Sequence, residues 1–316
     1  MNNNHDFTEG EILRPMLTFR GPVLLAMFLQ SLYGAVDLMV VGKFAEAADA
    51  SGVNTGSQVM MMLTFVVTSF SMAVTILMGQ HIGEKSPEKA GDVIGTGIIM
   101  FAVMAIAMTF AGVMFAPEIA AGLKAPRDAF NHTVSYIRVC SSCFVFIIAY
   151  NVMSGVFRGV GDSVMPLISV TIASVFNIIG DLFFVKGMGM GAKGAAIATV
   201  MAQVISVILS MFIISKRKMP FILTKDKLRI DKSIAKRIFS LGTPLLLQDI
   251  LVSVSFLFLL AITNSRGVIV SAGVGIAEKL CGFIMLVPSA FSQSVSAFVA
   301  QNVGARRMDR ANRALK

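Results

Sequence analysis

Eight stretches of this 316-residue chain are each long and apolar enough to cross a lipid bilayer. A transmembrane helix needs about 20 mostly apolar residues to cover a hydrocarbon core about 30 Å thick. Only 14% of the residues are charged, about half the share found in soluble domains. The sequence therefore predicts an all-α polytopic membrane protein and excludes a soluble enzyme, a disulfide scaffold and a disordered chain. The predicted spans cover residues 17–41, 53–80, 93–115, 134–157, 167–185, 192–215, 240–263 and 268–302.

The distribution of the 27 lysines and arginines predicts how the chain crosses the membrane. If the N-terminus is cytoplasmic, 19 of them lie on the cytoplasmic side and six on the outer side, with Arg138 and Lys279 inside spans. Positive charge gathers on the cytoplasmic side of membrane proteins, so both termini are expected there, in a multi-pass protein of the cell membrane. The net charge of +9 does not indicate nucleic-acid binding, because the basic residues are spread between apolar runs.

An internal repeat relates the last two spans to the first two at an offset of 221–222 residues. Pro22-Val-Leu-Leu matches Pro244-Leu-Leu-Leu, and the Gly-Gln-His-Ile-Gly of 79–83 matches the Ala-Gln-Asn-Val-Gly of 300–304. Six spans thus form one unit, and its copy is related to it by an axis along the membrane normal. The predicted parts are a six-helix N-lobe, a basic cytoplasmic linker and the first two helices of a repeated C-lobe, at residues 1–215, 216–239 and 240–316. Because the second lobe is only partly present, such a chain is expected to insert into the membrane but not to function alone.

Four polar residues are predicted to meet near the outer ends of their spans. Asp37 and Asp181 each lie four residues from an outer end, hence about 6 Å deep. Asn177 precedes Asp181 by four residues and shares its helix face, and Thr199 lies about 10 Å deep in the next span. A buried carboxylate is expensive in a membrane, so function is the default explanation. Carboxylate, amide and hydroxyl oxygens suit a hard cation such as Na⁺, or a proton; a purely structural polar cluster is the alternative.

Several short motifs resemble the multidrug and toxic compound extrusion (MATE) family. They are Gln30-Ser-Leu-Tyr-Gly-Ala-Val-Asp37, the loop at 157–166, Asn177-Ile-Ile-Gly-Asp181, Gly194-Ala-Ala-Ile-Ala-Thr199 and Gln301-Asn-Val-Gly304. The resemblance implies a protein of twelve spans in two six-helix lobes. It also implies cation-coupled export of cationic or amphipathic organic compounds by alternating access. The family's N-lobe cation site corresponds to Asp37, Asn177, Asp181 and Thr199, and the coupling ion would be H⁺ or Na⁺, with no cofactor.

A second polar group is predicted near the membrane midplane, formed by Asp249, Glu278 and Lys279. Asp249 and Lys279 could neutralise each other as an ion pair, which is the favoured interpretation. The alternative is a second contact for the cation or the substrate. Pro22 and Pro244 interrupt the first and seventh spans, where each removes a backbone hydrogen bond. They are predicted to be hinges, with a static kink as the alternative.

Other functions fit the sequence less well. A flippase for lipid-linked saccharides would need several basic residues inside its cavity, and the spans contain only Arg138 and Lys279. A membrane-embedded enzyme would need a nucleophile with a base, or metal-binding histidines, yet the three histidines lie at span ends or in loops. The Gly-x-Gly-x-x-Gly of 189–194 joins two predicted spans, so it is interpreted as a turn rather than a dinucleotide site. Cys140 and Cys143 are interpreted as buried thiols, and the Arg158–Asp162 loop as a structural turn.

Overall fold

The computed structural model describes residues 7–217, 219–265 and 268–315, with side chains except at some positions between 257 and 279. The described chain is helical, without a strand. Its helices are α1 (Leu13–Phe44), α2 (Ala47–Gly83), α3 (Pro87–Met114), α4 (Ala116–Gly122), η2 (Arg127–Ala129), α5 (Phe130–Ser142), α6 (Phe144–Val160), α7 (Val164–Asp181), η3 (Leu182–Gly187), α8 (Gly191–Lys216), η4 (Lys225–Lys227), α9 (Lys232–Ser265), α10 (Val268–Gly304) and α11 (Met308–Ala314).

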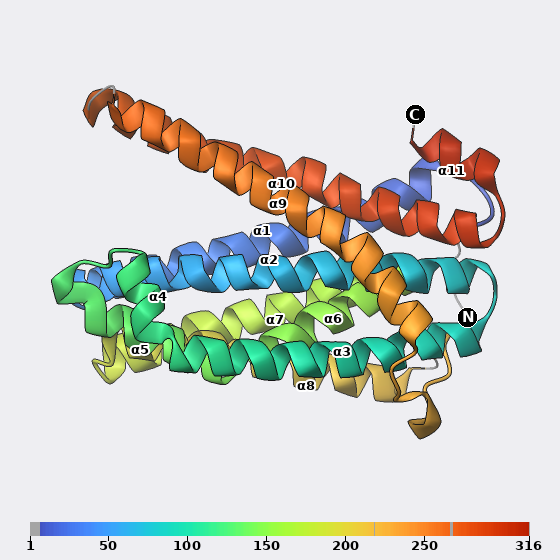
Figure 1. Ribbon diagram of the computed structural model, residues 1–316, viewed down its shortest axis with the longest axis horizontal. Coiled ribbons are helices and arrows are strands. Elements are labelled where there is room, and N and C mark those ends of the chain that lie inside the picture. Colours follow the sequence, from blue (N-terminus) through green and yellow to red (C-terminus); the bar gives the residue numbers. More distant parts are fainter. Residues whose placement is uncertain (1–6, 218, 266–267, 316) are drawn as a thin grey trace.

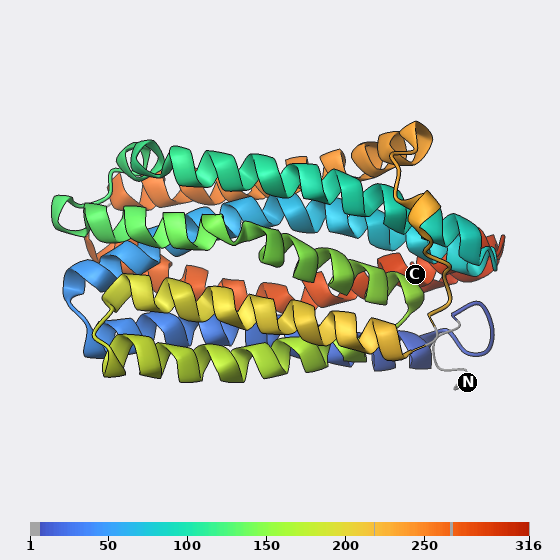
Figure 2. The ribbon, with the colours of Figure 1, turned by 90° about the horizontal axis from the view of Figure 1, so that it is seen from below.

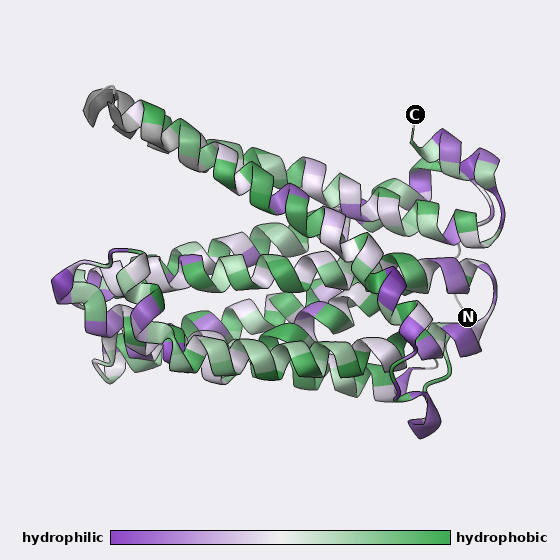
Figure 3. Cartoon of the chain, in the orientation of Figure 1, coloured by the Kyte–Doolittle hydropathy of each residue, from purple (hydrophilic) through white to green (hydrophobic). Residues whose placement is uncertain are grey.

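The helices confirm the prediction of an all-α membrane protein. Within the described residues, seven helices are long and apolar enough to cross a bilayer, and α5 with α6 would make an eighth if this bent pair is one span. Both ends of the bundle are hydrophilic, while the length between them is mostly hydrophobic (Figure 3). Large apolar side chains face outward along this length, among them Met39, Ile106 and Met211. Outward apolar residues are the pattern expected where lipid is the solvent.

The predicted fourth span differs from a straight helix, because α5 and α6 meet at an angle of 55°. The break falls at Cys143, just after the Ser142 hydroxyl donates a hydrogen bond to the carbonyl of Val139, at 2.8 Å. Such a bond satisfies a backbone carbonyl that would otherwise continue the helix. Cys140 is a buried free thiol, as the sequence predicts, whereas Cys143 at the bend is a free thiol that is only half-buried.

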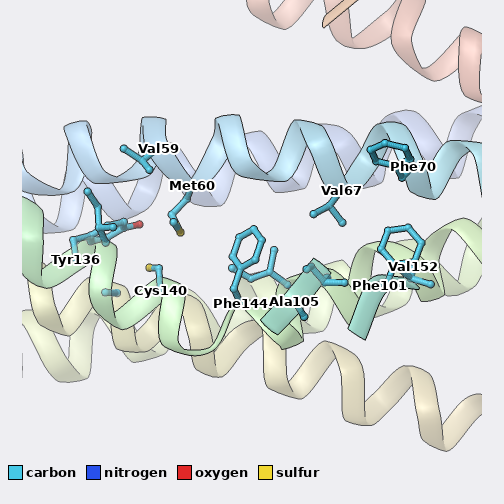
Figure 4. Close-up of a cluster of buried hydrophobic side chains, with 14 of the residues drawn as sticks. Val59, Met60, Val67, Phe70, Phe101, Ala105, Tyr136, Cys140, Phe144 and Val152 are labelled. Carbon is cyan, nitrogen blue, oxygen red and sulfur yellow. The ribbon is translucent and has the colours of Figure 1, made fainter. Parts of the chain in front are cut away.

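The long helix α2 lies at the centre of the molecule. It packs against α3, α5 and α6 on one side and against α9 and α10 on the other. Side chains of α2, α3, α5 and α6 interdigitate there, including Val67 and Phe70 of α2, Phe101 of α3 and Phe144 of α6 (Figure 4). Helices α1, α7 and α8 form a second group beside this core, visible from below in Figure 2. The candidate site belongs to that second group.

The internal repeat is evident in the helices themselves. Helices α2 and α10 have 37 residues each, and both of their ends are related by the 221-residue offset. At the end of the bundle that holds both termini (the termini end; Figure 1), α2 and α10 cross closely. A Cβ atom on Gly83 would overlap the carbonyl oxygen of Gln301, and one on Gly304 would overlap that of Gln80. The two contacts are equivalent under the repeat, because Gly83 corresponds to Gly304 and Gln80 corresponds to Gln301.

Further contacts join the lobes at the termini end. Gln301 donates to the carbonyl of Gly159 on α6 at 3.1 Å, and Arg237 donates to Gln80 at 2.9 Å. The segment before α1 contributes Phe7, whose ring is 2% exposed and packs on Phe298 of α10. Toward the opposite end (the far end), α9 and α10 diverge from the bundle (Figure 1). The structure is therefore closed between the lobes at the termini end.

The segment joining α8 to α9 is shorter than the predicted linker at residues 216–239. Helix α9 begins at Lys232, because the Asp231 carboxylate accepts hydrogen bonds from the backbone of Ser233 and Ile234, at 2.8 and 3.1 Å. An aspartate in this position caps a helix. Of the nine lysines and arginines in the predicted linker, Lys232, Lys236 and Arg237 lie on the first turns of this helix. Pro22 and Pro244 lie inside α1 and α9, which continue through them, and their role as hinges stays a prediction.

Candidate cation-binding site

The structure brings together the four residues that the sequence predicts for a cation site. Asp37 comes from α1, Asn177 and Asp181 from α7, and Thr199 from α8; these three helices pack against one another. Asp37 is 4% exposed, while Asn177 and Asp181 are completely buried. The Thr199 hydroxyl donates a hydrogen bond to Asp37 Oδ2 at 3.1 Å. The Asp37 carboxyl also interacts with the side chains of Asp181 and Asn177. Two carboxyl groups thus share one enclosed space.

Several oxygen atoms in this space have no hydrogen-bond partner within the described chain. They are Asp37 Oδ1 and both carboxyl oxygens of Asp181, accompanied by both amide atoms of Asn177. A buried polar atom without a partner costs about 1–3 kcal/mol, and more when it is charged. Three such carboxyl oxygens, next to an amide and a hydroxyl, therefore form a set of oxygen ligands suited to a cation. A proton bound between the carboxyls, or a small hard cation, would satisfy them.

The local backbone explains how α7 and α8 hold these groups so close. Gly180 of α7 faces Ala198 of α8, and a Cβ atom on Gly180 would lie 3.0 Å from the Cβ of Ala198. Small residues allow membrane helices to approach closely. Directly after Asp181 the helix widens into a π-helical turn, Leu182–Gly187. Single π-helical turns occur frequently at functional sites, and the hydropathy pattern gives no sign of this one.

Replacing Gly180 by Leu is expected to separate α7 from α8 and carry Thr199 away from Asp37. Overpacking of this kind costs about 1–3 kcal/mol, so the melting temperature should fall and binding of the coupling cation should weaken. Gly42→Leu is the matched control, because a Cβ atom on Gly42 would meet nothing within 4 Å. Equal melting temperatures for the two variants would contradict this account of the α7–α8 contact.

Sequence reasoning missed four side chains around the site. Tyr33 lies one turn before Asp37, and Gln203 lies one turn after Thr199 and donates to the Tyr33 hydroxyl at 3.4 Å. Gln30 also interacts with Tyr33, and Tyr136 of α5 interacts with Thr199. The helical spacing of four residues from a predicted ligand is the signal that could have found Tyr33 and Gln203. Tyr136 had no such signal, because it reaches the site from a different helix.

The second predicted polar group is described only in part. Asp249 of α9 is half-buried and accepts a hydrogen bond from the Ser69 hydroxyl of α2 at 3.2 Å. The side chains of Glu278 and Lys279 lie outside the described residues, so the predicted ion pair of Asp249 stays a prediction. No group of three His, Cys, Asp or Glu side chains suited to a metal occurs in the described part of the chain.

The two glycine-containing turns that the sequence singled out are structural. Gly161 adopts a left-handed backbone, with φ of 90°, directly after α6. Asp162 then accepts hydrogen bonds from the backbone of Val164 and Met165 at the start of α7, at 3.0 and 3.1 Å. At the far end, Gly191 also has a positive φ, and the neighbouring Ala192 donates its backbone N–H to Asp49 at 2.8 Å. The Gly-x-Gly-x-x-Gly motif is thus a turn between membrane helices.

The fold is a bundle of membrane helices built from an internal repeat, and one repeat unit encloses a pair of carboxyls. These features define a polytopic transporter. A family model described as MatE matches residues 22–183 and 244–316. The chain therefore belongs to the MATE family of multidrug efflux transporters, and the resemblance seen in the sequence is confirmed. Members of this family are transporters and not enzymes, so the alternative of a membrane-embedded enzyme is excluded.

Relatives in sequence and in structure agree with this assignment. The chain is 26% identical over 320 residues to the probable multidrug resistance protein YoeA of Bacillus subtilis, covering 98% of this chain and 68% of the relative. It is 22% identical to the multidrug export protein MepA of Staphylococcus haemolyticus, covering 94% and 66%. An outward-facing MATE transporter structure superposes with a TM-score of 0.91 at 20% identity, covering 99% and 70%. The structural likeness shows that the fold is shared.

Proposed function

We propose that this chain exports cationic or amphipathic organic compounds in exchange for H⁺ or Na⁺, and that Asp37, Asn177, Asp181 and Thr199 bind the coupling ion. The observation that supports it best is the enclosed pair of carboxyls with three unpartnered oxygens. Like charges at short range resist simultaneous ionisation, so binding one cation between them is favourable. The names of the relatives from Bacillus and Staphylococcus support organic compounds as the exported class.

The contacts between the lobes fit an alternating-access cycle. In this conformation the lobes touch at the termini end, through the Gly83–Gln301 and Gly304–Gln80 contacts. Opening this end would require both contacts to part, while α9 and α10 approach the bundle at the far end. In such a cycle one lobe rocks against the other. The excess of Lys and Arg at the termini end supports a cytoplasmic location for both termini, in the cell membrane.

A flippase for lipid-linked saccharides is the alternative export function. It would need basic side chains facing a central cavity to hold a diphosphate. Arg138 of α5 is exposed on the surface of the bundle, and the side chain of Lys279 is outside the described residues. Organic cations need no such basic side chains, and acidic side chains within the bundle would attract them, because opposite charges attract strongly where the dielectric is low.

The proposed orientation predicts where reporter tags should appear. A tag inserted between residues 217 and 231 should be inaccessible to an impermeant label in intact cells. A tag next to Asn131, an exposed residue of α5 near the far end, should be labelled. The measurement is labelling before and after permeabilisation. Labelling of both tags from the same side would contradict the proposed topology, since an odd number of spans must separate them.

The export function itself can be tested in a hybrid that needs no assumption about where this chain ends. Residues 1–316 would replace the matching two thirds of the Bacillus subtilis relative, and efflux of a cationic dye would be followed in vesicles. We expect efflux to depend on an imposed H⁺ or Na⁺ gradient and to stop when that gradient is collapsed. Efflux that runs equally well without either gradient would contradict cation exchange. Comparing the two gradients identifies the coupling ion.

A further inference from the structure

A row of buried polar side chains continues from the cation site toward the termini end. Tyr33, next to Asp37, packs against Tyr150 of α6. Tyr150 interacts with the Ser154 side chain one turn further along α6. The Ser154 hydroxyl in turn accepts a hydrogen bond from Arg158 Nη1 at 2.7 Å. Because residues four apart share a helix face, Tyr150, Ser154 and Arg158 form a ladder on one side of α6, inside the N-lobe.

This row is polar where apolar packing would be cheaper. Tyr150 and Ser154 are each 6% exposed, and Gln203, bonded to Tyr33, is 8% exposed with its Oε1 atom unpartnered in the described chain. Buried polar groups in a membrane protein are costly and mark ion or substrate pathways by default. The row therefore connects the cation site to the termini end of the N-lobe.

Arg158 ends this row, and no carboxylate in the described part of the chain neutralises its charge. Among the described residues it has no ion pair, and its Nε atom is buried without a hydrogen-bond partner. The nearest carboxylate along the chain, Asp162, is bound by Arg217 at 3.3 Å and by the first backbone N–H groups of α7. Arg158 is half-buried, and a charge that is partly removed from water without a partner is costly, so an unpaired guanidinium here requires another explanation.

The direction of the Arg158 side chain excludes the usual explanation for an unpaired arginine near a helix end. Arginines near helix ends often extend outward to the membrane surface. Arg158 lies in the last turn of α6, and its guanidinium instead points back along the helix to Ser154, into the lobe. The positive charge therefore faces the polar row rather than the lipid headgroups.

We propose that Arg158 is an electrostatic barrier that prevents the coupling cation from passing through the N-lobe to the termini end. An exchanger must not let its coupling ion cross without substrate, and a fixed arginine excludes cations from the pores of other membrane proteins. A unit positive charge repels a cation about 12 Å away enough to slow its passage roughly tenfold at an effective dielectric near 20. The proposal rests on the proposed function, since it assumes that Asp37 and Asp181 admit the cation.

The test measures cation leak in vesicles that hold the purified 316-residue chain and no organic substrate. A pH-sensitive or Na⁺-sensitive dye inside reports entry after a membrane potential is imposed. Wild type and Arg158→Lys should leak little more than empty vesicles, because both keep the charge. Arg158→Gln should leak about tenfold faster, and adding Asp37→Asn to it should stop the leak.

Ser154→Asp provides a second variant in case Arg158→Gln does not fold. It places a carboxylate beside Arg158 Nη1 and neutralises the charge without removing the side chain, so it too should leak. Leak equal to wild type in a folded Arg158→Gln or Ser154→Asp protein would overturn the proposal, as would equal leak in Arg158→Lys and Arg158→Gln. Measuring cation binding by the same preparations separates the test of the cation site from the test of the barrier. Unchanged cation binding in Asp37→Asn refutes the cation site. Intact cation binding in an Arg158→Gln protein that does not leak refutes only the barrier.

Discussion

Replacing Asp37 or Asp181 by Asn is expected to abolish dye export by the hybrid transporter, reducing it to the level of empty vesicles. Asn has nearly the shape of Asp but cannot take up a proton at neutral pH, and it gives a cation one oxygen without a charge. Because the two carboxyls share one enclosed space, losing either should remove coupling entirely rather than halve it. Removing a buried charge should make membrane insertion easier, so loss of export would report on coupling.

Asp128→Asn is the matched control for these two variants. Asp128 lies in η2 at the far end, as the cation site does, but its side chain is exposed and outside the site. Its replacement should leave export unchanged. Wild-type export by Asp37→Asn or Asp181→Asn, at equal protein levels, would contradict the assignment of the site.

Adding a side chain at Gly83 or Gly304 is expected to open the termini end. A Cβ atom on either glycine would overlap a carbonyl oxygen of the other lobe, and backbone atoms in packed helices have little freedom to retreat. Overpacking costs about 1–3 kcal/mol, which corresponds to roughly a 5- to 150-fold shift between two conformations. Since the two contacts are repeat equivalents, Gly83→Val and Gly304→Val should produce similar shifts.

Cross-linking across the termini end measures this shift. The native cysteines would be replaced by Ser, and Lys85→Cys with Arg306→Cys would place one thiol on each lobe, beside the same pocket of about 530 Å³. A short cross-linker should join them readily in the parent protein and at least fivefold more slowly in either Val variant. Gly21→Val is the control, because a Cβ atom there would meet nothing within 4 Å. Unchanged cross-linking in both Gly83→Val and Gly304→Val would refute the proposed contact between lobes.

The shared depth of Asp37 and Asp181 could be predicted from the sequence, and the family resemblance then indicated that they meet. Both residues lie four positions from the outer end of an apolar stretch, and a helix converts that count directly into a height. The repeat could be found for a similar reason, since polar Gln80 and Gln301 stand out against an apolar background. Which helices are neighbours does not follow from depth. For that reason Tyr136, which reaches the site from α5, was not predicted.

Features that depend on side-chain detail were also beyond the sequence. The bend at Cys143 arises from a local hydrogen bond of Ser142. The hydropathy of a whole segment, which predicted the span, does not reveal such a bond. The start of α9 at Lys232 depends on one capping carboxylate, Asp231, within a run of basic residues that looks like a linker. Arg158 belongs by sequence to a glycine-containing turn, and only the direction of its side chain places its charge inside the lobe.

Direct measurement of cation binding by the purified 316-residue chain tests the central claim most closely. The readouts are bound ²²Na⁺ at saturating Na⁺ and the protons released or taken up when Na⁺ is added. We predict one cation site per chain, lost in Asp37→Asn and in Asp181→Asn, weakened in Gly180→Leu and retained in Asp128→Asn. If H⁺ is the coupling ion, no Na⁺ should bind, and Asp37→Asn and Asp181→Asn should each lose a proton uptake at neutral pH that Asp128→Asn retains. Equal cation and proton binding in wild type, Asp37→Asn and Asp181→Asn would contradict the assignment of this site.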